Sequence, residues 1–206
     1  RFTCTCRSDN NNNFIHEKPI LKKYEIKKVV FIGDIKHAFS FEFQEKNEFE
    51  EVIEFLGNML PQENIILIKG NHDTIDYTFE GNFKGCHIEK DIAFIHGDEM
   101  VKQAFSKKIN TIIMGHIHPS VVISDKAGIK REKYKCFLEG NYKGKKILVL
   151  PSFLDIVEGT PVNDFPEEYS DFFSIIPKKV LMNFKVHVIG EDNVYEFGKV
   201  GQIRKF

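Results

Sequence analysis

The chain of 206 residues has no tryptophan, only four cysteines and no long apolar run. A membrane-spanning helix needs about 20 consecutive apolar residues, and neither such a run nor a signal peptide is visible. The cysteines, at positions 4, 6, 86 and 136, lack zinc-type C-x-x-C spacing and are too few to suggest a disulfide framework. We therefore expect a cytoplasmic protein with no membrane partner.

An excess of either charge is also lacking, because 29 Lys and Arg residues face 30 Asp and Glu residues and the net charge is -1. This balance excludes a global electrostatic reason for binding nucleic acid. Residues 126–146 are locally basic. They can contact a nucleic-acid backbone or form a solvated hairpin, and we favour the hairpin.

Short apolar runs are present, and they indicate the secondary structure. Four of them have the form of buried strands, at 29–32, 65–68, 92–95 and 112–114. Residues 47–59 carry apolar side chains at helical spacing. Further strand-like runs lie at 120–124, 134–139, 147–150, 183–189 and 193–197. With no repeat or linker, the pattern predicts a single α/β domain over residues 1–206, irregular at 1–16, in which helices cover sheets that pack on each other.

Each of the four buried runs is followed by a polar cluster. The clusters are Gly33-Asp34-Ile35-Lys36-His37, Gly70-Asn71-His72-Asp73, His96-Gly97-Asp98 and Gly115-His116-Ile117-His118-Pro119. In open α/β sheets, ligands bind beyond the carboxyl ends of the strands. We therefore expect the four clusters to meet in one crevice. A Gly-Asp pair alone is readily explained as a turn, and His96 alone as a structural or surface histidine. The second and fourth clusters are more specific, and the set together favours a ligand site.

The donor types in these clusters predict a metal site. Imidazole, carboxylate and amide oxygen suit manganese, iron, zinc or nickel. Asp34 is the candidate for a carboxylate that bridges two ions. His116 and His118 are two residues apart, so we expect both rings on one side of an extended segment. Two neighbouring ions can clamp a phosphoryl group during hydrolysis.

In this order the clusters resemble the signature of the calcineurin-like metallophosphoesterase superfamily, over about residues 28–163. The resemblance implies a two-sheet β-sandwich flanked by helices and a phosphoesterase activity. Within the superfamily the sequence is most similar to the archaeal SbcD-related phosphoesterases and the DNA-ligase-associated metallophosphoesterases. The segments that carry this narrower similarity are residues 33–39, residues 115–119, and residues 150–153 leading to Gly159-Thr160-Pro161-Val162-Asn163.

The resemblance also implies residue roles, with two divalent ions, Mn²⁺ foremost, as cofactors. Asp34 would bridge both ions and His118 would bind the first. The ligands of the second ion would be Asn71, His96 and His116. The catalytic residues would be His72, which faces the phosphate as general acid, Asp73, which orients His72, and His37, which also faces the phosphate.

One part of the family signature is missing, namely the D-x-H motif that should precede Asp34 on the first strand. Asp9-Asn10-Asn11 is a degenerate candidate for this motif. We favour the alternative that the motif lies upstream of Arg1. If it is absent altogether, the first ion keeps only Asp34 and His118 as ligands and would be held weakly.

Three functions remain open at this point. The first is hydrolysis of a phosphodiester, including DNA or RNA. The second is hydrolysis of a small phosphate ester or a cyclic nucleotide at the same site. The third is a catalytically degenerate binding scaffold, like the retromer subunit that has this fold. Retention of His72 argues against the scaffold, which would not need a catalytic acid.

Overall fold

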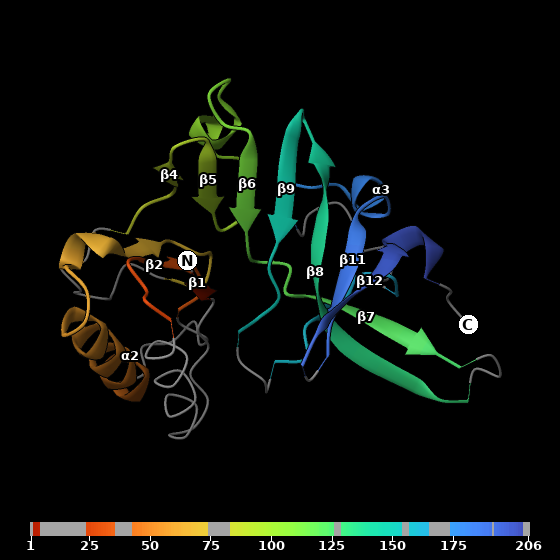
Figure 1. Cartoon of the computed structure of the whole chain (residues 1–206), viewed down its shortest axis with the longest axis horizontal. Helices are drawn as coiled ribbons and strands as arrows, with labels where there is room; N and C mark the ends of the chain where they lie inside the picture. The colour runs from red at the N-terminus through yellow and green to blue at the C-terminus, as the bar shows by residue number, and fades with distance from the viewer. Residues whose placement is uncertain are drawn as a thin grey trace.

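The computed structural model describes residues 2–4, 24–35, 43–73, 83–125, 129–153, 157–164, 174–190 and 192–203. The strands in this part of the chain form two sheets, one of three strands and one of nine (Figure 1). No helix in these ranges is both long enough and apolar enough to cross a membrane.

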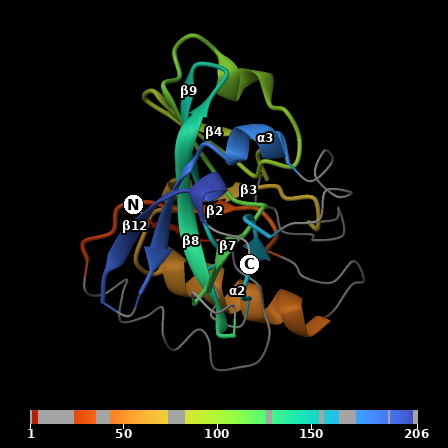
Figure 2. The same cartoon turned by 90° about the vertical axis from the view of Figure 1, so that its right-hand side faces the viewer.

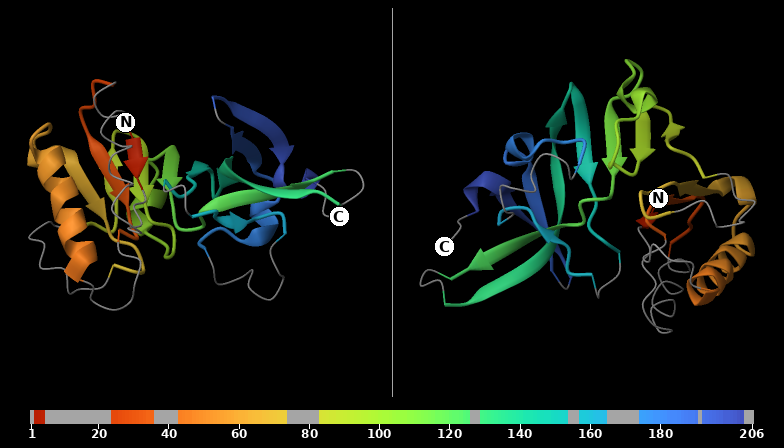
Figure 3. Two further views of the ribbon diagram at one scale, coloured as in Figure 1. Left: turned by 90° about the horizontal axis from the view of Figure 1, so that it is seen from below. Right: turned by 180° about the vertical axis from the view of Figure 1, so that it is seen from behind.

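The smaller sheet is entirely parallel and has the order β1-β2-β3. Its strands are β1 (Phe2–Cys4), β2 (Val29–Ile32) and β3 (Ile65–Ile68). Side chains alternate between the two faces of each strand. Val29, Phe31 and Leu67 pack against α2 (Phe43–Gly57), which covers one face (Figures 1 and 3). The short 3-10 helix η1 (Gln62–Asn64) leads into β3.

The opposite face of the smaller sheet packs against the larger sheet. Val30, Ile32, Ile66 and Ile68 contact Phe94 and Leu150, and all six side chains are buried. Burial of these two apolar faces stabilises the contact between the sheets, by about 25 cal/mol per Å² of apolar surface removed from water. This contact brings the ends of β2 and β3 close to the ends of the strands in the larger sheet.

The larger sheet is mixed. Its main path runs β10-β7-β8-β9-β6-β5-β4, and β11 joins β8 and β12. The strands are β4 (His87–Glu89), β5 (Ile92–Ile95), β6 (Thr111–Met114), β7 (Pro119–Ser124), β8 (Arg131–Tyr142), β9 (Lys145–Val149), β10 (Thr160–Pro161), β11 (Lys185–Ile189) and β12 (Val194–Lys199). The neighbours β5, β6 and β9 are parallel. The long strand β8 runs most of the height of Figure 2.

Three short helices cover the larger sheet: η2 (Lys102–Phe105), α3 (Lys178–Leu181) and η4 (Val200–Gln202). They contribute Ala104, Leu181 and Val200 to the main core, which is otherwise built from the strands and the segments between them. The end of β7 and the beginning of β8 extend away from the rest of the larger sheet (Figures 1 and 3).

The observed fold confirms the predicted class, an α/β arrangement of two packed sheets with few helices. The predicted buried strands at 29–32, 65–68, 92–95 and 112–114 coincide with β2, β3, β5 and β6, and the predicted helix lies within α2 apart from its last two residues. The sequence did not predict β4 and β10, because strands of three and two residues leave almost no periodic pattern. The expectation of an irregular segment at 1–16 was wrong for Phe2–Cys4, which pairs with β2. A single domain over residues 1–206 remains a prediction.

Candidate metal centre

The His96 ring, at the end of β5, lies at the centre of the site. The residue is 2% exposed. Its Nδ1 lies 2.8 Å from the carbonyl oxygen of Ile32. A carbonyl oxygen can only accept a hydrogen bond, so Nδ1 carries a proton and donates it. In the neutral ring, Nε2 is then a lone pair that points into the site, which is the usual orientation of a histidine that binds a metal.

Three further donor groups surround the Nε2 atom of His96. Asp34 Oδ2 lies 3.2 Å away, Asn71 Oδ1 3.1 Å away and His116 Nδ1 3.1 Å away. A proton on Nε2 could satisfy only one of these groups. A divalent cation could satisfy all of them, because metal–ligand bonds of about 2.0–2.1 Å place neighbouring ligands about 3.0–3.4 Å apart. The donor atoms of Asp34, His96 and His116 all lie within 4.8 Å of one another.

The charges at the cluster favour an ionised Asp34. Burial disfavours the ionised Asp34 carboxyl, but the hydrogen bond and the charge of His96, together with His72, outweigh burial and lower the pKa of Asp34. Burial likewise disfavours a charged His96, but Asp34 and the Ile32 carbonyl outweigh it and raise the pKa of His96. The carboxylate of Asp34 is therefore ionised at neutral pH and ready to bind a cation.

The backbone of the site is strained at three of the predicted ligands. Asp34, His116 and His118 have φ angles of 52°, 62° and 46°. Among the described residues only Lys90 and Lys143 share this feature without being glycines, and each lies in a turn. Left-handed backbone at ordinary residues costs about 1–3 kcal/mol each and concentrates at functional sites. The prediction that His116 and His118 lie on an extended segment was therefore wrong.

Two glycines allow the loops after β2 and β3 to touch. A Cβ atom on Gly70 would lie 2.3 Å from both the backbone nitrogen and the Oδ1 atom of Asp34. A Cβ atom on Gly33, whose φ is 74°, would lie 2.5 Å from Nδ1 of His96. No real Cβ contact is this short, so the ligands can come together only because both positions lack a side chain.

Asp73 holds the same two loops together through its carboxylate. It is 4% exposed. Its Oδ2 accepts hydrogen bonds from the backbone nitrogens of Asp34 and Gly70, at 2.9 and 2.8 Å, and its Oδ1 accepts one from Ile35 at 2.9 Å. The sequence had suggested that Asp73 orients His72. The three bonds show a further function, because they fix the loop that carries Asp34.

The other predicted site residues occupy different positions. The backbone N–H of His72 donates to Asp34 Oδ1 at 3.0 Å, which places His72 beside the cluster. His118 is not in the group of three described acid and histidine side chains whose donors converge. His37 lies outside the described residues, and so does Asp9 of the degenerate motif.

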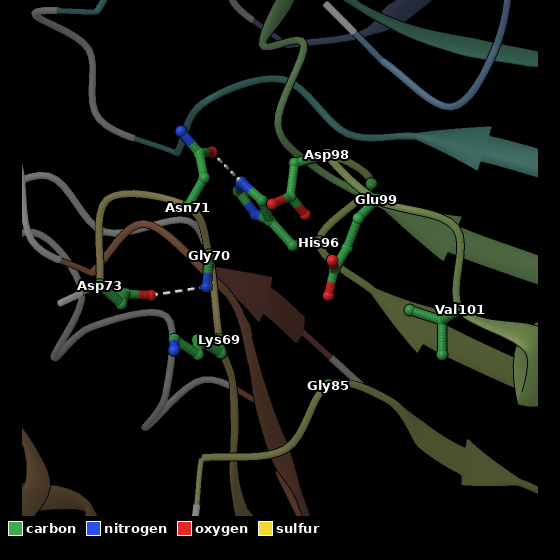
Figure 4. A pocket seen from close by; sticks show the side chains of 10 residues that line it. Lys69, Gly70, Asn71, Asp73, Gly85, His96, Asp98, Glu99 and Val101 are labelled. Carbon is green, nitrogen blue, oxygen red and sulfur yellow. Dashed lines mark hydrogen bonds between the residues drawn. The ribbon is translucent and has the colours of Figure 1, made fainter. Parts of the chain in front are cut away.

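A cavity of about 410 Å³ opens beside His96 and Asn71 (Figure 4). Lys69 and Gly85 also line it, as do Asp98 and Glu99 from the loop after β5. The sequence gave no role to these last two acids or to Lys69. In the sequence, only their position close to predicted ligands indicated that they could line the site. The cavity gives a substrate direct access to one side of the donor cluster.

Many cations of the basic stretch at 126–146 have acidic partners in its described part. Lys130 pairs with Glu132, Arg131 with Asp164, Lys133 with Glu158 and Lys146 with Glu139, at 2.6–2.9 Å. Lys145 is buried and donates to two backbone carbonyls. Neighbouring acids thus offset four of the positive charges, and the solvated hairpin remains the interpretation that we favour.

Two packed sheets with carboxylate, amide and imidazole donors at their strand ends are the framework of a metal-binding hydrolase. The sequence profile of the calcineurin-like phosphoesterases matches residues 9–157. The chain belongs to this family. It is therefore a hydrolase of phosphate esters, and the donor cluster agrees with the metal binding of the family. No curated protein matches the sequence significantly.

Comparison with solved structures supports the fold. The nuclease MPE of Pseudomonas putida superposes with a TM-score of 0.56 and 16% identity, over 89% of this chain and 76% of that protein. At this identity the likeness shows the fold alone. YfcE, a phosphoesterase from E. coli, gives a TM-score of 0.39 with 13% identity, over 88% and 87% of the two chains. A Vps29 single mutant from Entamoeba histolytica gives 0.41 with 14%, over 75% and 74%. Neither of these two carries a functional argument.

Proposed function

We propose that the chain hydrolyses phosphodiesters at a centre of two divalent metal ions. The observation that carries the proposal is the arrangement around His96, whose Nε2 lone pair faces a carboxylate, an amide oxygen and a second imidazole within 3.2 Å. A diester is our first choice of substrate. The adjoining cavity, about 410 Å³, falls in the range of small-molecule pockets, about 300–1,000 Å³.

Asp34, Asn71, His96 and His116 would hold one ion, and Asp34 would also reach a second ion bound by His118. When bound, such ions supply positive charge to the phosphoryl group and lower the pKa of the attacking water. Mn²⁺ is our first choice because mixed oxygen and nitrogen donors suit it. Iron, zinc and nickel are chemically acceptable alternatives.

His72 is the proposed proton donor to the leaving oxygen. Its backbone N–H is bound to Asp34 Oδ1, so the residue stays beside the metal ligands. A side-chain imidazole can transfer a proton near neutral pH. Asp73 keeps the loop of His72 in place through Gly70, and it would also orient the ring of His72. His37 would assist by facing the phosphate.

The nucleic-acid class is the substrate we infer first, in keeping with the nuclease that shares the fold. The test uses protein stripped with chelator and reloaded with Mn²⁺. It is assayed on bis-(p-nitrophenyl) phosphate, p-nitrophenyl phosphate, and single- and double-stranded DNA. We expect turnover of the diester and of DNA that depends on the metal. Turnover of the monoester alone would overturn the choice of substrate.

Two histidine variants make this test specific. His116→Ala removes a ligand of the cluster and should abolish both Mn²⁺ binding and turnover. The matched control is His187→Ala, because His187 is also a half-buried histidine but lies on β11, outside the cluster. Equal loss of activity in both variants would contradict the proposed centre.

A further inference from the structure

The loop that carries His116 and His118 has a conformation that it cannot hold by local interactions alone. Both histidines have positive φ angles, 62° and 46°. Strain of this kind persists only where the surrounding structure enforces it. Within the loop, Gly115 N donates to His96 O and Ile117 N to Gly115 O. These bonds hold the first half of the loop. Another element bonds to the second half.

That element is the segment Gly159–Asn163, about 40 residues further along the chain. The backbone N–H of Thr160 donates to the carbonyl oxygen of His118 at 2.8 Å, and that of Val162 donates to Ser120 at 2.9 Å. These bonds belong to the parallel pairing of β10 with β7. The carbonyl of one of the strained histidines is therefore fixed directly by this segment.

Gly159 permits the close approach. Its φ is 82°, and a Cβ atom there would lie 2.3 Å from the carbonyl oxygen of His118. Any side chain at this position would push the segment away from the histidine loop, and the left-handed backbone would add strain of its own. The glycine is thus required for the bond between Thr160 and His118.

Asn163 fastens the other end of the segment. It is 3% exposed. Its Oδ1 accepts the backbone N–H of Val122 at 2.9 Å, and its Nδ2 donates to the carbonyl oxygen of the same residue at 2.8 Å. The side-chain amide thus bonds to Val122 as the backbone of a neighbouring strand would. Loss of the amide would remove the partners of both the N–H and the C=O group of Val122.

We propose that Gly159–Asn163 is a clamp that holds the histidine loop in its metal-binding conformation, with Gly159 and Asn163 as positioning residues of the metal centre. The inference rests on the proposed function. In the described contacts, Gly159 lies against the backbone of His118 and Asn163 bonds to the backbone of Val122. Both act through β7 and the His118 carbonyl, in the way that outer residues orient metal ligands.

The test measures Mn²⁺ affinity by calorimetry for wild type, Asn163→Ala and Gly159→Ala. The control is Asn183→Ala, because Asn183 also donates its side-chain amide to a backbone carbonyl but does so next to α3. Loss of an outer positioning residue typically weakens metal binding about 10–100-fold. We expect at least a tenfold rise in Kd for both clamp variants and less than a twofold change for the control.

A second readout separates positioning from plain stabilisation. The melting temperature is measured with chelator and again with saturating Mn²⁺. A clamp variant should show a smaller metal-induced rise than wild type, whereas a merely structural residue would lower both temperatures equally. If Asn163→Ala does not fold, the Mn²⁺ affinity of Gly159→Ala is the test of the clamp. Any folded clamp variant with wild-type Mn²⁺ affinity overturns the clamp, whereas a wild type that binds no Mn²⁺ overturns the proposed function instead.

Discussion

The Asp73 carboxylate accepts the backbone N–H of Asp34 at 2.9 Å, so one buried acid fixes the backbone that presents another. The two residues are 39 positions apart and follow neighbouring parallel strands. Asp34 itself has a φ of 52°. The bonds of Asp73 to Asp34, Ile35 and Gly70 supply the constraint that such a strained ligand needs.

Asp73→Asn should therefore destabilise the protein and weaken its metal binding. An amide can accept with one atom only, so at least one of the three buried N–H groups loses its partner, at about 1–3 kcal/mol. We expect a drop in the free energy of unfolding of at least about 1 kcal/mol in urea titrations. Asp91→Asn is the control, because Asp91 is exposed and its carboxylate bonds to the side chain of Asn110. Equal stability of the two variants would show that the three bonds are unimportant.

Gly70→Ala should disrupt the site far more than Gly85→Ala. Both glycines line the same cavity, and neither has a positive φ. A Cβ on Gly70 would strike Asp34, whereas one on Gly85 would meet no atom within 4 Å. We expect Gly70→Ala to lower Mn²⁺ affinity at least tenfold and Gly85→Ala to leave it within a factor of two, as measured by calorimetry. Similar affinities would contradict the close approach of the two loops.

The thiol of Cys136 should resist alkylation in the native protein. The residue is fully buried, and burial raises the pKa of its thiol to about 12. The thiolate is the reactive form, so almost none is present at pH 8. Peptide mass spectrometry after iodoacetamide treatment should find Cys136 unmodified in buffer and modified in urea. Equal labelling rates in the two conditions would mean that β8 opens readily.

Neutralising the hairpin cations should leave the affinity for DNA unchanged. Lys133 already pairs with Glu158 and Lys130 with Glu132. Each cation that contacts a nucleic-acid phosphate contributes about one unit to the salt dependence of binding. Binding titrations at several salt concentrations should give Lys130→Gln and Lys133→Gln the wild-type slope. Lys69→Gln, in the cavity wall, should reduce it. A reduced slope for the hairpin variants would restore the nucleic-acid interpretation of this stretch.

The sequence predicted the convergence of four residues better than it predicted the shape of their loops. Asp34, Asn71, His96 and His116 were expected to meet because each follows an apolar run, and burial of such runs forces strands whose ends converge. Their roles as ligands stay a prediction. The φ angles of His116 and His118 could not be predicted, because a bond from Thr160 helps to set them. The backbone bonds of Asp73 escaped prediction for the same reason, since their partners become neighbours only after the strands pair.

Both sheets contribute residues to the site. Asp34 and Asn71 follow strands of the smaller sheet, whereas His96 and His116 follow strands of the larger one. A fragment or chimaera divided between the sheets would keep only half of the proposed ligands, so it should bind metal poorly. Functional recombinants of related proteins should therefore take both sheets from the same parental protein.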